Sequence, residues 1–238
     1  METLADVLAR DRRSDAPALT AAGDGVQRYD YRRFLTTAWK AGNFMHHHGV
    51  RTGSTVAVAT EPRAQPVLAF LGASLLGAQT RFDPPPTVDA KLLVAPTARL
   101  DEYEVPPGTQ RIGYGDDPED PAYWYWEGGV WSENPTMPPE PCRPDDGILW
   151  TEERVYTHAD LLAGARQARD ALDLTGDERV AVRAPVADPR TIAAGVLGAL
   201  LTGCEILFPG PAEEGDVAVA TGEDAPEARV FALASLDL

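Results

Sequence analysis

The pattern of hydrophobic and polar residues along the chain repeats once. Residues 29–86 and 156–211 both read as an amphipathic helix, an apolar strand, a second and more apolar helix, a second strand and a Pro-rich exit. Any two β-α-β units share such a pattern, but here the residues that end the elements also match at a constant offset, which favours shared ancestry. The matched pairs are Gly72-Ala73 with Gly198-Ala199, Gly77 with Gly203, and Phe82 with Phe208.

The first copy predicts a helix that begins at Asp30 and ends at Gly49. Asp is a favoured N-cap, and Gly commonly follows the last residue of a helix. A strand at 55–60 and a helix at about 66–76 come next. The apolar face of the first helix consists of Phe34, Leu35, Ala38, Ala41 and Met45.

The second copy predicts a helix capped by Thr157, with Asp160 three residues later in near capping-box style. A strand at 179–184 and a helix at about 189–202 follow. The apolar face of the capped helix consists of Leu161, Leu162, Ala165, Ala168 and Leu172. Acid and small residues fill the tail after residue 211, which either adds a last strand at 217–220 or packs against nothing.

Strands that alternate with helices of this length form β-α-β units, whose strands are parallel and covered on both faces. The apolar runs 56–59 and 92–95 have the composition of such buried strands. The predicted fold is therefore α/β, with two pseudo-repeated, doubly wound and mostly parallel subdomains. We expect one subdomain at 1–144 and the other at 145–238, separated by a Pro-rich linker at 135–144.

An aromatic segment lies between the copies. Residues 123–131 read Tyr-Trp-Tyr-Trp-Glu-Gly-Gly-Val-Trp, which predicts a short hairpin that turns at Gly128 and Gly129. Its rings could stack on a base or a sugar. Aromatic clusters more often pack against the body of their own domain, and we favour that role here.

The charge balance excludes several classes of partner. With 37 acidic and 21 basic residues the formal net charge is −16, which disfavours nucleic acid and anionic membranes as partners. Lys occurs only at Lys40 and Lys91, and all other basic residues except His are Arg. Abundant acid with little Lys suggests adaptation to a salty cytoplasm, where counterions screen self-repulsion. An acidic protein from a GC-rich genome would also favour Arg, Ala, Gly and Pro.

Metal and redox chemistry find no support in the sequence. Cys142 and Cys204 are far apart and form no metal-binding spacing, so the protein is expected in a reducing compartment, by default the cytoplasm. The run His46-His47-His48 cannot face one ion, because consecutive helical residues point in different directions. We expect a solvated helix C-terminus there, whose cations complement the helix dipole.

Both copies carry segments that resemble the start of the adenylate-forming superfamily, which includes acyl-CoA synthetases, luciferases and peptide-synthetase adenylation domains. Members begin with a capped Thr-Tyr-x-Glu-Leu helix and a Gly-Val-x-x-Gly-Asp turn into a Val-rich strand. Here residues 30–34 read Asp-Tyr-Arg-Arg-Phe and residues 49–54 read Gly-Val-Arg-Thr-Gly-Ser. The second copy has Glu-Arg-Val-Tyr-Thr-His-Ala-Asp-Leu-Leu at 153–162, similar to the family's Lys-Gly-Val, Thr-His and Leu-rich helix. The resemblance covers most of residues 1–211.

The loop that grips ATP in this family is missing. The family places Thr-Ser-Gly-Thr-Thr-Gly-x-Pro-Lys-Gly between a buried strand and the Thr-His helix, where backbone N–H groups cradle phosphates. Here the strand at 147–150 passes directly into Thr-Glu-Glu-Arg. At roughly 4 Å and an effective dielectric near 20, each contact between a carboxylate and a phosphate would cost about 4 kcal/mol before screening. This degenerate phosphate-loop position comprises Thr151, Glu152, Glu153, Arg154, Thr157 and His158.

Other residues that the family uses have no counterpart in the expected place. Residues 114–119 and 175–177 faintly resemble its Mg²⁺ and ribose segments, but their order along the chain differs, and we interpret both as turns. The family's later nucleotide-binding segments and mobile C-terminal domain would lie after residue 238. His158 could serve as a base, but no nucleophile stands beside it in a known motif, so we expect it to be structural.

These observations predict a non-catalytic relative of acyl-CoA synthetases, a pseudoenzyme that binds a partner or an acyl-type ligand without a cofactor or metal. The missing remainder of the family fold motivates the prediction of a homo-oligomer or a partner subunit. The alternative is a component of an AMP-dependent acyl-CoA or acetyl-CoA ligase that uses ATP, AMP and CoA together with a second subunit. If the family likeness is accidental, a generic Rossmann-like fold predicts one continuous sheet instead of two.

Overall fold

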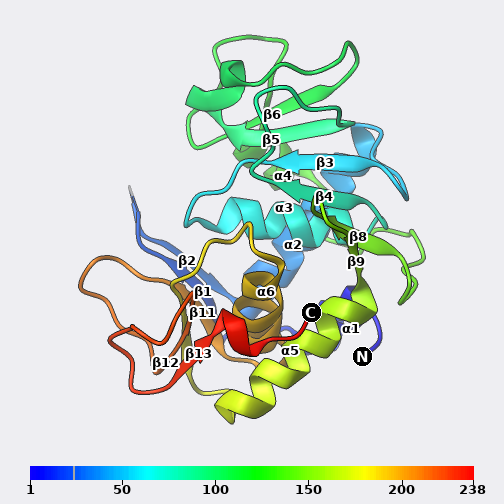
Figure 1. Ribbon diagram of the computed structural model, residues 1–238. Coiled ribbons are helices and arrows are strands. Elements are labelled where there is room, and N and C mark those ends of the chain that lie inside the picture. The colour runs from blue at the N-terminus through cyan, green and yellow to red at the C-terminus, as the bar shows by residue number, and fades with distance from the viewer. Residues whose placement is uncertain (24) are drawn as a thin grey trace. The chain divides into compact units, whose positions relative to one another are not determined.

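The computed structural model describes residues 1–23 and 25–238, whose strands belong to two sheets (Figure 1). The strands are β1 (Pro17–Ala21), β2 (Gln27–Asp30), β3 (Thr55–Val58), β4 (Gln79–Phe82), β5 (Leu92–Pro96), β6 (Gln110–Tyr114), β7 (Trp124–Tyr125), β8 (Gly147–Trp150), β9 (Val155–Thr157), β10 (Arg179–Val182), β11 (Glu205–Phe208), β12 (Val217–Ala220) and β13 (Val230–Ala232). The α-helices are α1 (Leu4–Val7), α2 (Tyr31–His47), α3 (Ala64–Ser74), α4 (Trp126–Ser132), α5 (His158–Leu172), α6 (Pro189–Thr191) and α7 (Gly198–Thr202). A π-helical segment, η3 (Ile192–Leu197), joins α6 to α7, and the 3₁₀-helices are η1 (Arg10–Arg12), η2 (Thr97–Glu102) and η4 (Leu233–Ser235).

The two sheets have matching strand orders. One runs β7-β6-β5-β3-β4-β8-β9 and the other β13-β12-β10-β11-β1-β2. In both, the inner strands are parallel and an antiparallel hairpin closes one end, β8–β9 in the first sheet and β1–β2 in the second. The predicted fold class, with two mostly parallel sheets, is confirmed. The alternative of one continuous sheet is wrong.

The compact units of the chain do not follow the predicted division at 144/145. One unit contains residues 1–35, 62–64 and 158–238, and the other contains residues 36–61 and 65–157. The division differs because each of the two hairpins pairs with the sheet of the other half of the sequence. The β1–β2 hairpin precedes the first repeat but pairs with the second sheet, at Leu19 and Ile206, whereas β8 pairs with the first sheet, at Thr80 and Leu149. The segment 135–144 therefore belongs to the unit formed by residues 36–61 and 65–157, and it is not a linker between the two units.

The first helix of each repeat, α2 and α5, begins where the sequence predicts, whereas α3 lies two residues earlier than predicted and the helix at 189–202 contains the π-helical segment η3. The Asp30 carboxylate accepts a hydrogen bond from the Arg33 N–H at 2.6 Å, which caps α2, and Gly49 adopts a φ of +84° directly after it. The predicted apolar face of α2 is fully buried, as is nearly all of the corresponding face of α5. The strand predicted at 217–220 is also present, as β12, but it is not the last, because β13 follows it.

Within the 36–157 unit, α2 and α3 cross at two glycines. A Cβ on Gly72 would lie 2.7 Å from the backbone nitrogen of Gly42, and one on Gly42 would lie 3.0 Å from the Gly72 carbonyl oxygen. The side chain of Asn43 next to this crossing donates to the carbonyl oxygens of Asn134 and Thr136 at 3.0 and 2.8 Å. The Pro-rich segment is thus packed along α2.

Substitution of Gly72 by Ala is expected to destabilise the protein by about 1–3 kcal/mol, because the backbones of the two helices must move apart to admit one methyl group. Gly222 provides the matched control, since an added Cβ there has no neighbour within 4 Å. Urea unfolding of both variants measures the difference. A Gly72→Ala variant as stable as Gly222→Ala would contradict the close crossing.

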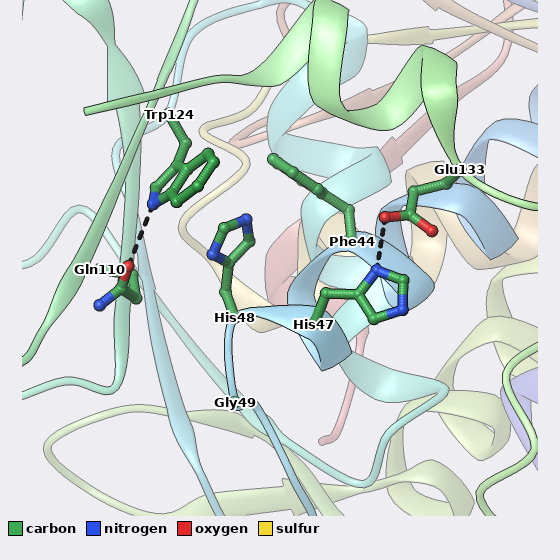
Figure 2. Close-up of a pocket in the computed structure, with 7 residues that line it drawn as sticks. All are labelled: Phe44, His47, His48, Gly49, Gln110, Trp124 and Glu133. Carbon is green, nitrogen blue, oxygen red and sulfur yellow. Dashed lines mark hydrogen bonds and ion pairs between the residues drawn. The ribbon is translucent and has the colours of Figure 1, made fainter. Parts of the chain in front are cut away.

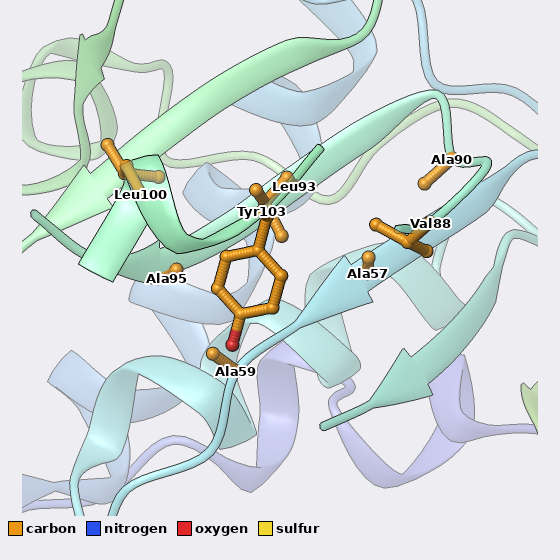
Figure 3. Close-up of a cluster of buried hydrophobic side chains, with 8 residues drawn as sticks. All are labelled: Ala57, Ala59, Val88, Ala90, Leu93, Ala95, Leu100 and Tyr103. Atoms are coloured by element: carbon orange, nitrogen blue, oxygen red, sulfur yellow. The ribbon is translucent and has the colours of Figure 1, made fainter. Parts of the chain in front are cut away.

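A compact apolar cluster covers one face of the β3–β5 region. Figure 3 shows the Tyr103 ring lying across this cluster, which residues after β4 and around η2 complete. Its members are Ala57, Ala59, Val88, Ala90, Leu93, Ala95, Leu100 and Tyr103. The small side chains on the strands leave room for the larger ones above them.

The predicted aromatic hairpin is wrong. Trp124 and Tyr125 pair in parallel with β6 as β7, and the chain then forms the helix α4 through both glycines. Trp126 and Val130, four residues apart, form its buried face. Gly129 is required because a side chain there would overlap the ring of Phe44. Gly129 thus serves a close approach between α4 and α2, whereas a hairpin would have used the glycines for a turn.

Candidate functional site

The position of the missing phosphate loop is a tight turn between β8 and β9. The Thr151 N–H donates to the Arg154 carbonyl oxygen at 2.9 Å, and the Thr151 hydroxyl donates to the same oxygen at 3.1 Å. The Arg154 N–H in turn donates to the Thr151 hydroxyl oxygen at 3.2 Å. Two of the four backbone N–H groups of residues 151–154 therefore point into the turn and hold it closed.

The side chains of this turn are charged and directed to neighbours on the same sheet. Glu152, whose side chain is 85% exposed, pairs with Arg81 at 3.3 Å. The Arg81 guanidinium stacks over the Trp150 ring at 4.2 Å, and the Arg154 guanidinium lies 4.4 Å from the centre of the Tyr156 ring. Glu153 is exposed. The turn thus presents two carboxylates to solvent, while the neighbouring guanidinium groups lie against aromatic rings.

The remaining predicted site residues, Thr157 and His158, contact the backbone of neighbouring elements. Thr157 pairs with Gly147 at the end of the β8–β9 hairpin. His158 is the first residue of α5, is completely buried, and accepts a hydrogen bond at Nδ1 from the Leu4 N–H at 3.1 Å. This bond joins α1 to α5 within one compact unit. The structure therefore groups residues 151–154 in one turn, while His158 lies in the other compact unit.

The two segments that resemble nucleotide-binding strings are turns, as predicted. Gly115 follows β6 with a φ of +92°, and its N–H donates to the Glu127 carboxylate at 3.2 Å. Gly176, between α5 and β10, has a φ of +105°. Its N–H and that of Thr175 donate to the Glu178 carboxylate at 3.1 and 3.0 Å.

The three consecutive histidines point to three different partners. His46 pairs with Glu140 at 3.4 Å, and His47 Nδ1 lies 2.7 Å from the Glu133 carboxylate. The third, His48, packs between aromatic rings. Among residues 1–23 and 25–238 no grouping of three His, Cys, Asp or Glu side chains could hold a metal ion. Sequence reasoning missed the two glutamates, because neither lies near α2 in the sequence.

No helix formed by the described residues is both long enough and apolar enough to cross a lipid bilayer.

Comparison with known proteins identifies relatives of this fold only among solved structures. No protein-family model and no curated protein sequence matches the chain. A crystal structure of the anthranilate CoA ligase AuaEII with anthranoyl-AMP superposes with a TM-score of 0.75 and 16% identity, over 91% of this chain and 49% of that one. A Mycobacterium tuberculosis fatty acyl CoA synthetase gives a TM-score of 0.71 at 16% identity, over 88% and 45%. The nonribosomal peptide synthetase FmoA3 gives 0.69 at 20% identity, over 89% and 23%.

The chain therefore spans about half or less of the length of these three proteins. The N-terminal domain of FACL13 from Mycobacterium tuberculosis also matches, over 92% of this chain, with a TM-score of 0.70 and 16% identity. The predicted resemblance to the adenylate-forming enzymes is confirmed as a likeness of fold, and the matched portion corresponds to their N-terminal part.

Proposed function

We propose that this chain, which has the fold of the N-terminal part of the adenylate-forming enzymes, is a non-catalytic module of that fold that acts by binding a partner. The observation that carries the proposal is the closed turn at 151–154. A phosphate-binding loop needs several backbone N–H groups directed outward at one anion. Here Thr151 and Arg154 direct theirs inward, and Thr151 also commits its hydroxyl to the turn.

Electrostatics support the same conclusion. The outward side chains of the turn are Glu152 and Glu153, so a bound triphosphate would meet like charge. Arg81 offsets part of the Glu152 charge, but its guanidinium is stacked on Trp150 and only 19% exposed. The formal net charge of −16 adds a repulsive field over longer distances. Concentrated KCl screens that field, and we propose a salty cytoplasm as the working environment.

A partner surface is suggested by exposed indole. The Trp131 side chain is 80% exposed, and the Lys40 ammonium lies 5.3 Å from the centre of its ring. Tryptophan is enriched where proteins contact one another and is expensive to leave in water. We propose that this face of α4 forms a contact in a homo-oligomer or with a partner subunit.

Light scattering after size exclusion in concentrated KCl tests the binding role. We expect a mass above that of the 25.6 kDa monomer, and a return to the monomer in Trp131→Ser. The matched control is Val26→Ser, which removes another exposed apolar side chain, 53% accessible, and should leave the mass unchanged. A monomeric wild type that also recovers no partner from extract would refute the proposed role.

The second candidate is a ligase component that receives its missing parts from another polypeptide. The fold favours it, since the AuaEII and fatty acyl CoA synthetase structures are named as CoA ligases or synthetases. Pyrophosphate exchange with a panel of carboxylic acids distinguishes the two. We expect no exchange above the blank, and exchange with any acid would replace the proposed function by this one.

A further inference from the structure

A cavity of about 640 Å³ lies at the C-terminal end of α2, within the 36–157 unit. It is separate from the 151–154 turn, and neither the resemblance nor the comparisons assign it a role. Figure 2 shows the residues that form it, which come from α2, β6, β7 and the segment after α4. They are Phe44, His47, His48, Gly49, Gln110, Trp124 and Glu133.

Three aromatic rings form one wall of this cavity. The His48 imidazole lies 4.4 Å from the Trp124 ring and 4.6 Å from the Phe44 ring, centre to centre, so the rings stand in a row (Figure 2). The Trp124 N–H donates to the Gln110 side-chain oxygen at 3.1 Å, which fixes the indole. Despite these contacts Trp124 remains 47% exposed. A large, immobilised π surface is thus left open to a ligand.

A carboxylate faces the same space. Glu133 holds one oxygen 2.7 Å from His47 Nδ1, and its side chain is only 12% exposed. Burial, and then the neighbouring His47, lower the pKa of His48, although Glu133 opposes this, so the imidazole between the two rings is neutral at pH 7. The exposed Lys91 side chain lies against Gly49, which also lines the cavity.

We propose that this cavity binds a small organic cation with a quaternary ammonium headgroup. Aromatic faces attract such a cation through their quadrupoles, and a partly desolvated carboxylate adds a direct charge. The exposed Trp124 ring supplies the first of these attractions and Glu133 the second, while the buried Phe44 ring supports His48 from the other side. The acidic surface of the chain raises the local concentration of cations. Lys91 opposes the cation from the Gly49 side, which provides a test of the sign of the ligand's charge.

The probe is choline chloride, titrated at constant ionic strength against NaCl, with 3,3-dimethylbutan-1-ol as its neutral isostere. Protein labelled with ¹⁵N at tryptophan reports the site, and Trp124→Phe assigns the Trp124 indole signal. We expect choline to shift that signal and the isostere to bind at least about tenfold more weakly. Glu133→Gln should also weaken choline binding about tenfold, whereas Lys91→Gln should strengthen it.

Val26→Ser is the control, because it alters an exposed apolar side chain that does not line the cavity and should leave the affinity unchanged. Thermal melting confirms that each variant is folded. Equal binding of choline and its isostere, or no shift of the Trp124 signal, would overturn the proposal, as would an unchanged affinity in Glu133→Gln. Each of these outcomes is independent of oligomer mass and pyrophosphate exchange, so the proposed function stands or fails separately.

Discussion

Substitution of Arg183 by Ala is expected to destabilise the protein by about 3–5 kcal/mol, because it leaves a buried carboxylate without its counter-ion. The Arg183 Nε donates to both carboxylate oxygens of Glu227, at 3.0 and 2.8 Å, and Nη2 donates to one of them at 2.7 Å. The Glu227 side chain has no exposed surface. The Gly215 N–H adds a further hydrogen bond at 3.0 Å. This pair ties the segment between β12 and β13 to the residue that follows β10.

Urea unfolding followed by circular dichroism measures this loss. Arg32→Ala is the matched control, because Arg32 and its partner Asp15 are 55% and 84% exposed, and such pairs contribute about 1 kcal/mol or less. The double variant Arg183→Met with Glu227→Leu should recover most of the stability, since it removes both charges and keeps the volume. If Arg183→Ala lowers the free energy of unfolding no more than Arg32→Ala does, the pair of Arg183 and Glu227 does not stabilise the fold as proposed.

The second large effect is a loss of stability in acid that depends on Glu178. Burial alone would raise its pKa, but hydrogen bonds from the Thr175 N–H and hydroxyl, from Arg229 and from Cys204 outweigh it and lower the pKa to about 2. An unfolded glutamate binds its proton near its ordinary value of 4.5. The stabilisation from this carboxylate is therefore complete above that value and is lost as the pH falls toward 2. The shift corresponds to at most about 3 kcal/mol.

Glu178→Gln should therefore lower the free energy of unfolding by up to about 3 kcal/mol at pH 7 and by almost nothing near pH 2. Urea titrations across this pH range give the difference between the wild type and the variant. The exposed Glu223 provides the control, as Glu223→Gln should leave the profile unchanged. A difference between wild type and Glu178→Gln that does not vary with pH would contradict the assigned hydrogen bonds.

Local features of the fold could be predicted from the sequence because they depend on residues close together in the chain. The helix faces and the Gly49 terminus follow from spacing and capping, and the strands predicted at 55–60 and 179–184 are present at 55–58 and 179–182. The β1–β2 hairpin pairs with the second sheet and the β8–β9 hairpin with the first. This pairing could not be predicted from the sequence, because it joins residues that are far apart in the chain. The helix α4 was missed for a similar reason, because Phe44 dictates the glycine at 129.

For the candidate site, too, some features could be predicted from the sequence and others depend on contacts between distant residues. The shortness and acidity of residues 151–154 are visible in the sequence, and the structure adds that Thr151 closes the turn on Arg154. The role of His158 depends on the Leu4 N–H, which is distant in the sequence. Glu133 could not be predicted as part of a site, because its partner His47 is distant in the sequence and no local motif includes it.

Isothermal titration of MgATP into the protein in concentrated KCl tests most directly whether the turn between β8 and β9 can hold a nucleotide. Heats equal to those of dilution are the predicted result. The N–H groups of Thr151 and Arg154 point into the turn and cannot bind a phosphate, and the carboxylates of Glu152 and Glu153 repel one. A saturable heat with one ATP per chain, lost when residues 151–154 are replaced by a different turn, would contradict the account.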